Sequence, residues 1–348
     1  MAGFIEKIPS EIADEEMGVV VYKIANYPAD YTLQGLYDKE KEEEILIPPF
    51  QRRFVWTLSQ ASRLIDSFLL GLPVPSIFLY KEKESQKLLV IDGQQRLKTI
   101  FGYFNGIFPD TKKPFYLKGV NKKWEDKTFL DLNAPDKRRL KDSVLRAVIV
   151  EQLDPKDNTS IFHIFQRLNT GGTTLSPQEI RNCTHHGKFN DSLNELNRNE
   201  AWRKIIGLPV PDRRMRDVEL ILRFLGLYCE YKEYEEPMKV FLSTFMDKYR
   251  NDEVKIEEFR KIFEETISSI ASKLNSHPFR IKTGLHAAVF DSVMVAFALN
   301  LNNIPPDIRE RHQKLLKDKE YEECVYKFTT VEEFVKQRID MAIKKLFR

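Results

Sequence analysis

The sequence predicts an α+β protein in which a mixed α/β N-terminal domain is followed by an α-helical C-terminal domain. Two observations lead to this prediction. Short β-rich runs alternate with amphipathic helical runs in the first half of the chain, whereas beyond Trp202 apolar residues recur only at helical spacing. We place the boundary near this change of period, which gives domains of residues 1–200 and 201–348.

The first elements are short. We expect a strand at Gly18–Ile24, a helix from Tyr31 to about Glu44, and a strand at Ile45–Ile47 that Pro48-Pro49 ends.

A second helix follows Trp56, with Thr57 or Ser59 as its N-cap, and Gly71 followed by Pro73 ends it. Two β-rich runs then suggest a hairpin, and another strand comes later. These strands are expected at Ile77–Tyr80, Leu88–Ile91 and Val144–Val150.

The pattern turns helical from Asn158. After a break, Ser176 is expected to cap a new helix, with Pro177 at the first helical position and Glu179 completing a capping box. Five further helices are expected at Val218–Tyr228, Lys239–Tyr249, Ile256–Leu274, Leu285–Leu301 and Val331–Phe347.

Composition narrows the classes of function. The 348 residues carry a net charge of only +3, so a nucleic-acid surface would have to be local. Cys183, Cys229 and Cys324 lack the spacing of disulfides or zinc sites, which suits a reducing compartment. No segment approaches the roughly 18 uninterrupted apolar residues of a membrane span. We therefore expect a cytoplasmic protein that is not inserted in a membrane.

The most informative motif is Asp92-Gly93-Gln94-Gln95-Arg96, which lies between a buried strand and an amphipathic helix. Such a turn presents backbone N–H groups and a guanidinium to one small volume, so it is a candidate phosphate site. A purely structural interpretation makes Asp92 the helix cap and Gln95 its capping-box partner. That interpretation leaves Gln94 and Arg96 unused, and an exposed or half-exposed Arg96 could join Gln94 in binding one anion.

Two other segments carry similar chemistry. The run from Phe50 to Trp56 offers arginines for phosphate and Gln51 for orientation, although arginines in such a run are more often solvated. The loop from Arg167 to Gly172 allows close backbone approach to a ligand, and Glu179 and Arg181 bring charges to the same junction. The alternative here is a glycine C-cap, a turn and a new capped helix.

Several well-known sites are excluded as motif matches. The chain has no P-loop, no dinucleotide-binding glycine pattern and no His-Glu-x-x-His pair, and we assign no metal ligand from spacing.

Taken together, four stretches resemble the N-terminal domain of GmrSD-type modification-dependent restriction enzymes, whose fold is ParB/sulfiredoxin-like. The resemblance covers roughly the first two hundred residues, and Arg216-Asp217-Val218-Glu219 resembles the usual helical continuation. The four stretches are Ile47–Trp56, Leu64–Ser67 with Gly71–Pro75, Val90–Leu97 and Phe165–Gly172.

The resemblance implies that Asp92 to Arg96 bind and hydrolyse a nucleoside triphosphate with Mg²⁺, which regulates DNA cleavage in phage defence. Longer relatives carry a C-terminal His-Asn-His-type nuclease domain. This chain's six histidines form no such cluster, so a separately encoded nuclease subunit is expected to cut DNA.

We therefore expect a nucleotide-binding, NTP-hydrolysing sensor or regulatory component of a bacterial anti-phage system. The alternatives are a non-catalytic DNA-binding or protein-adaptor module, or a ParB-like nuclease that nicks DNA. The expected partners are an NTP, DNA and the nuclease subunit, and an oligomer is compatible with the sequence. The expected catalytic residues are Asp92, Gln94 and Arg96, and the expected supporting residues are Glu179 and Arg181. The expected nucleotide-binding residues are Gln51, Arg52, Arg53, Gly93, Gln95, Arg167, Asn169, Thr170, Gly171 and Gly172.

Overall fold

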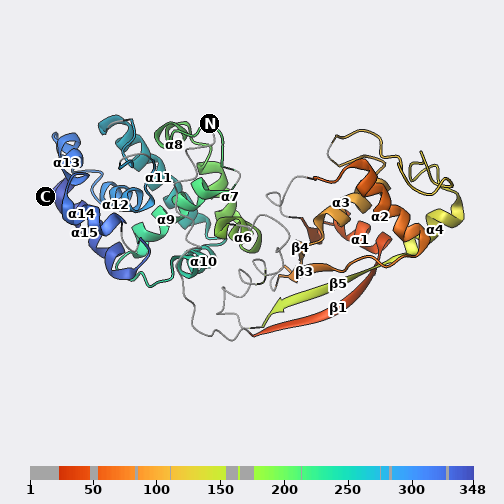
Figure 1. Ribbon diagram of the computed structural model, residues 1–348. Coiled ribbons are helices and arrows are strands. Elements are labelled where there is room, and N and C mark those ends of the chain that lie inside the picture. The colour runs from red at the N-terminus through yellow and green to blue at the C-terminus, as the bar shows by residue number, and fades with distance from the viewer. Residues whose placement is uncertain are drawn as a thin grey trace. The chain divides into compact units, whose positions relative to one another are not determined.

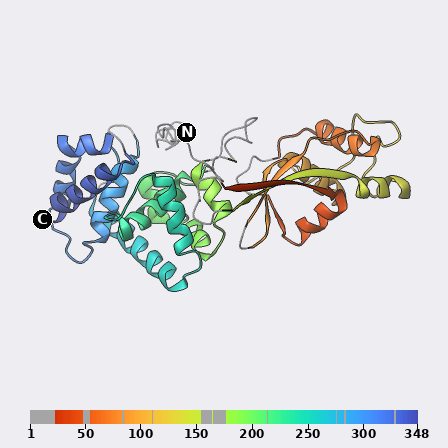
Figure 2. The ribbon, with the colours of Figure 1, turned by 90° about the horizontal axis from the view of Figure 1, so that it is seen from below.

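The computed structural model describes two compact units, which we call the sheet unit, within Val20–Leu175, and the helical unit, from Ser176 to Arg348 (Figures 1 and 2). Each unit has its own hydrophobic core. The described residues are 23–47, 54–82, 85–109, 111–153, 164, 176–212, 214–274, 276–281, 284–326 and 329–348.

This division falls earlier in the chain than the boundary expected near residue 200. The reason is that residues 176–206 contribute buried side chains to the helical core, among them Phe189, Trp202 and Ile206. The α+β fold class is confirmed, since a mixed sheet precedes a helical C-terminal region.

The sheet unit is built on five strands in the order β1-β5-β3-β4-β2. The pairs β1–β5 and β3–β4 are antiparallel, whereas β3–β5 and β2–β4 are parallel. Side chains at alternate positions of the central strand β3 and of its neighbour β5, such as Leu79 and Ile149, face the core. The strands are β1 (Ile24–Thr32), β2 (Ile45–Leu46), β3 (Ile77–Lys81), β4 (Leu88–Asp92) and β5 (Val144–Gln152).

Four helices complete the described part of the sheet unit, and the one before β3 has the caps that the sequence predicts. Thr57 is the N-cap, because its hydroxyl accepts from the Gln60 N–H while Gln60 Oε1 accepts from the Thr57 N–H at 2.9 Å. Gly71 ends the helix with φ of 74°. The helices are α1 (Leu33–Lys41), α2 (Leu58–Leu70), α3 (Gln94–Phe104) and α4 (Ala134–Asp142).

The first strand differs from the sequence prediction. The predicted strand at residues 18–24 lies outside the described residues except for its last two, and the chain instead pairs along Ile24–Thr32. Pro28 and Asp30 give this run a poor β propensity, but nine residues pair with β5 at the edge of the sheet, where proline is tolerated. The helix expected from Tyr31 consequently begins at Leu33, capped by Thr32.

The helical unit contains all five expected C-terminal helices, as well as the capped helix after Ser176. Four further helices, α7, α8, α13 and α14, were not predicted from the sequence, because they are at most nine residues long and too short for a clear period. The helices are α6 (Pro177–Thr184), α7 (Lys188–Leu196), α8 (Glu200–Ile206), α9 (Arg216–Glu230), α10 (Met238–Lys248), α11 (Glu253–Lys273), α12 (Ala287–Ala298), α13 (Ile308–Leu315), α14 (Lys319–Tyr326) and α15 (Glu332–Phe347).

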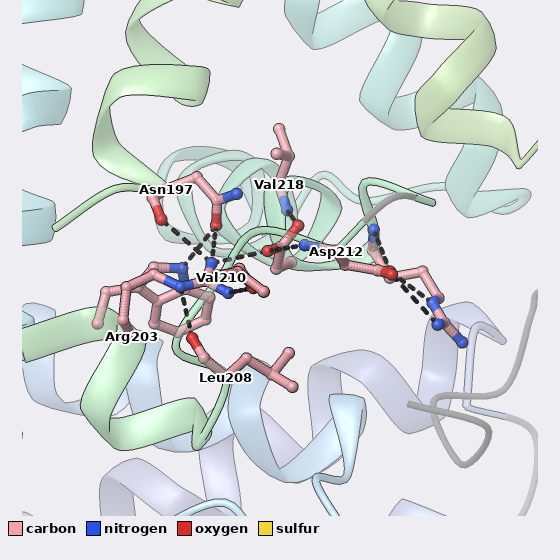
Figure 3. A network of polar contacts seen from close by, with 9 residues as sticks. Asn197, Arg203, Leu208, Val210, Asp212 and Val218 are labelled. Atoms are coloured by element: carbon pink, nitrogen blue, oxygen red, sulfur yellow. Dashed lines mark hydrogen bonds and ion pairs between the residues drawn. The ribbon is translucent and has the colours of Figure 1, made fainter. Parts of the chain in front are cut away.

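Helix α9 is tied to its neighbours by buried ion pairs. Figure 3 shows the first of them, in which Arg203 of α8 donates to Asp217 at 2.7 Å and to the carbonyl oxygens of Leu208 and Val210. Further along α9, Arg223 donates to Asp291 of α12 at 2.6 Å. Arg338 of α15 donates to the same Asp291 carboxylate at 2.9 Å. These partners fix which helices pack around α9.

A buried histidine, His312, and a partly buried one, His286, predict an acid-sensitive helical unit. Burial lowers the pKa of His286 and of His312 from 6.5 to about 4 in each case. In the unfolded chain both imidazoles take up protons as the pH falls below the ordinary histidine pKa of about 6.5. In the folded unit the same two imidazoles stay neutral until the pH reaches about 4. We expect stability to be lost as the pH falls from 6.5 to 4, by roughly 3 kcal/mol per histidine at most.

The measurement is urea unfolding of the full chain at pH 7.5 and pH 5, with hydrogen exchange of α12 and α13 as the local readout. His312 Nε2 lies 2.9 Å from the Pro278 carbonyl oxygen, and a glutamine amide could replace that contact without titrating. His312→Gln should therefore reduce the difference between the two pH values. An unchanged difference would show that this histidine is not a source of the acid sensitivity.

Candidate functional site

The Asp92–Arg96 turn has a backbone that only glycine fits. Strand β4 ends at Asp92, Gly93 has φ of 101°, and α3 begins at Gln94. A Cβ on Gly93 would lie 2.3 Å from Ile77 Cγ2, a separation that real Cβ atoms do not show. Positive φ and the close approach of β3 therefore both require glycine at this position.

The structural interpretation of Asp92 as a cap and Gln95 as its capping-box partner is wrong. Gly93 is the N-cap residue, no side chain caps the helix, and the first intrahelical bond runs from the Leu97 N–H to the Gly93 oxygen at 3.0 Å. The start of α3 also has no acidic residue in its first turn. The Asp92 side chain instead turns to Arg96.

Arg96 joins three segments of the sheet unit. Its Nη2 donates to Asp92 Oδ2 at 2.7 Å, and its Nη1 donates to the Pro75 and Ser76 carbonyl oxygens at 2.8 and 3.2 Å. The Arg96 side chain is only 14% exposed, whereas that of Asp92 is 42% exposed. The expectation of an exposed or half-exposed Arg96 side chain is therefore wrong. Its charge is balanced by Asp92.

Gln94 has a partner that the sequence analysis missed. Lys98, one turn further along α3, donates to Gln94 Oε1 at 3.1 Å. The Lys98 side chain is half-buried. This burial, with a smaller contribution from the charge of Lys112, lowers the pKa of Lys98. The signal in the sequence is the four-residue spacing from Gln94, which places both side chains on one face of a helix.

Gln95 connects the turn to the segment before α2. Its Oε1 accepts from the Val55 N–H at 3.0 Å, and its carbonyl oxygen accepts from Thr99 Oγ1 at 2.7 Å. Val55 is the second-last residue of the run from Phe50 to Trp56, so this hydrogen bond holds the described end of that run against the turn.

Eight of the expected nucleotide-binding residues lie outside the described residues. Their assignment to nucleotide binding stays a prediction. These residues are Gln51, Arg52, Arg53, Arg167, Asn169, Thr170, Gly171 and Gly172.

Glu179 and Arg181 belong to the helical unit and are engaged there. Glu179 completes the capping box with Ser176, with Oε2 2.5 Å from the Ser176 nitrogen, and its burial raises the pKa of this carboxyl group. Arg181 is fully buried and donates to Gln178 at 2.8 Å and to Glu219 of α9 at 2.6 Å. These contacts give both residues a role in holding α6, and their supporting role in a site stays a prediction.

The described ranges contain neither a metal-binding cluster of side chains nor a membrane-spanning helix. No group of three or more His, Cys, Asp or Glu side chains in these ranges is placed to hold a metal ion. None of the helices described has the length and apolar character needed to cross a membrane.

Gly93→Ala should destabilise the sheet unit by about 2–4 kcal/mol, because the new methyl group meets Ile77 and the backbone has positive φ. The matched control is Gly71→Ala, where φ is 74° and a Cβ would meet nothing within 4 Å, so about 1 kcal/mol is expected. Urea unfolding with an unchanged m-value is the measurement. Equal losses at the two glycines would contradict the close packing against Ile77.

Two comparisons with known proteins bear on the site. Residues 33–186 match the family described as the GmrSD restriction endonuclease, N-terminal domain, and this range includes the Asp92–Arg96 turn and α6. An uncharacterized protein of Methanocaldococcus jannaschii is 31% identical over 121 residues, which cover 27% of this chain and 21% of that relative. The chain thus spans about a fifth of that relative's length. Over residues 33–186 this chain is similar to the GmrSD N-terminal domain family, which confirms the resemblance inferred from its motifs.

Proposed function

We propose that this chain is a cytoplasmic, nucleotide-binding and nucleotide-hydrolysing regulatory component of a modification-dependent restriction system directed against phage. The observation that carries the proposal is the rigid Asp92–Arg96 turn, which lies inside the region that matches the GmrSD N-terminal domain. The start of α3 adds support, since it has no capping side chain and no acidic residue in its first turn. Helix starts of this kind favour phosphate groups.

Asp92 is suited to a triphosphate that arrives with Mg²⁺. Its Oδ2 is engaged by Arg96, while Oδ1 has no hydrogen-bond partner among the described residues. Mg²⁺ is commonly held by one or two carboxylates together with phosphate oxygens, so a single free carboxylate oxygen fits this ion. In this proposal Arg96 positions Asp92, and Asp92 orients the metal-bound phosphates or the attacking water.

The remaining expected residues have the roles that their side-chain and backbone chemistry suggests. Arg52, Arg53 and Arg167 would neutralise phosphate charge, and the glycines at 171 and 172 would offer N–H donors. A separately encoded nuclease would then cut DNA under the control of this nucleotide cycle.

The test is a nucleotide titration with each of the four ribonucleoside triphosphates, with and without Mg²⁺, followed by phosphate release with and without DNA. Binding should stabilise the chain by about 2.7 kcal/mol at a hundredfold excess over the dissociation constant. Asp92→Asn keeps an oxygen for Arg96 but removes the charge, so we expect hydrolysis to fall at least tenfold with little loss of stability.

The matched control is Asp142→Asn, which removes an exposed carboxylate at the end of α4 in the same unit. It should leave hydrolysis unchanged. A chain that none of the four triphosphates stabilises, with or without Mg²⁺, would refute the proposed function.

A second candidate function is binding of a DNA backbone, and local charge favours it. Residues 112–146 contain eleven Lys and Arg against five Asp and Glu, a net charge of +6 compared with +3 for the whole chain. Arg138, Arg139 and Lys141 of α4 are exposed, and both arginines line a groove of about 600 Å³ beside the end of α2. A concentrated basic surface of this kind suits phosphate contacts.

The double variant Arg138→Gln/Lys141→Gln should weaken DNA binding similarly for unrelated sequences and reduce the salt dependence of the binding constant by about two counterions. The control is Lys314→Gln/Lys317→Gln, two exposed lysines near the end of α13 in the helical unit with the same change of charge. Fluorescence anisotropy over a salt series is the measurement. Equal effects of the two double variants would rule out a specific role for α4.

A further inference from the structure

Lys98 carries a positive charge that nothing in the described part of the chain compensates. Its Nζ has one hydrogen-bond partner there, the neutral amide of Gln94 at 3.1 Å. The neighbouring guanidinium of Arg96 is paired with Asp92, so that carboxylate is already engaged. The excess charge at this end of α3 therefore belongs to Lys98.

This arrangement is unusual for a lysine on a helix. Lysines usually extend into solvent or pair with an acid three or four residues away, whereas Gln94, Gln95, Phe101 and Gly102 occupy those positions here. The side chain is half-buried, and both this burial and the charge of Lys112 disfavour the ammonium form. A fold that keeps such a group has a charge available for a ligand.

The bond from Lys98 also determines how Gln94 presents its amide. An ammonium has donors and no acceptor, so the atom it contacts must be the amide oxygen. The Gln94 nitrogen, with its two hydrogens, is then left without a partner among the described residues. Lys98 and Gln94 together offer several donors and one full positive charge, which matches the chemistry of phosphate oxygens.

We propose that Lys98, with the Gln94 amide that it orients, forms the contact for the phosphate chain of the nucleotide at the Asp92–Arg96 turn. This inference deepens the proposed function and rests on it. Lys98 thereby takes the phosphate contact that the sequence analysis assigned to Arg96, and Lys112 strengthens the local field. The recognised group is a polyphosphate.

The experiment measures binding of inorganic tripolyphosphate and of ATP with Mg²⁺ by calorimetry to the full chain. Lys98→Met keeps most of the side-chain volume and removes the charge, so both ligands should bind at least tenfold more weakly. Lys98→Arg restores a positive donor and should recover part of the affinity. Lys317→Met, which removes an exposed lysine of the helical unit, should stay within twofold of the parent chain.

Stability provides a second readout that a purely structural role would not give. Because the ammonium is half-buried and has no carboxylate partner in the described residues, Lys98→Met should leave the unfolding midpoint unchanged or raise it, while binding falls. A variant that loses stability and retains normal tripolyphosphate binding would overturn the inference.

The two proposals fail in different ways. If the parent chain hydrolyses nucleotide and Lys98→Met binds both ligands normally, the assignment of Lys98 is overturned and the proposed function stands. If tripolyphosphate binding depends on Lys98 but no nucleoside triphosphate is bound or hydrolysed, the anion site stands and the nucleotide function does not. If the parent chain does not bind tripolyphosphate, the inference is also overturned.

Discussion

The geometry of the candidate site depends on the three acceptors of Arg96. One guanidinium holds the end of β4, the start of α3 and the two residues before β3 at 2.7 to 3.2 Å. Gly93 makes this possible, because any side chain there would push β3 away at Ile77. The turn is therefore rigid before any ligand arrives, and a preorganised site loses little entropy on binding.

In the helical unit, buried ion pairs determine which helices pack against one another. The apolar cluster of this unit is large, and α12 is buried along nearly its whole length, so apolar packing alone would allow helices to slide or exchange neighbours. Charged residues of α9 pair with α6, α8 and α12, and each pair is specific to one neighbour. Because breaking one partner of a buried pair leaves an uncompensated charge, these contacts penalise alternative arrangements more than they add net stability.

The sequence predicts elements well where local chemistry determines them. The capping boxes at Thr57 and Ser176 and the glycine that ends α2 are in the expected places, because capping depends on residues within one turn. Strand β1 was missed because its pairing with β5 depends on residues more than a hundred positions away. The motif at residues 92–96 was recognised in the sequence, but the contacts that its side chains make were not predicted.

That second failure has a physical cause. Whether Arg96 faces a ligand or the carbonyl oxygens of Pro75 and Ser76 depends on where β3 enters the sheet, and no local pattern contains that information. Lys98 was overlooked for a related reason, since a lysine on an amphipathic helix is usually solvated, and only the fold shows that its one hydrogen-bond partner among the described residues is a neutral amide.

The two outer strands of the sheet affect how this protein can associate with other chains. On one side β1 carries Pro28, which has no N–H to donate, and on the other side β2 has only two residues. An incoming strand would find an interrupted ladder on one side and a very short one on the other, in the part of the sheet described. Edge-to-edge pairing of the described sheet is thereby discouraged, which favours association through side-chain surfaces, where sequence can specify the partner.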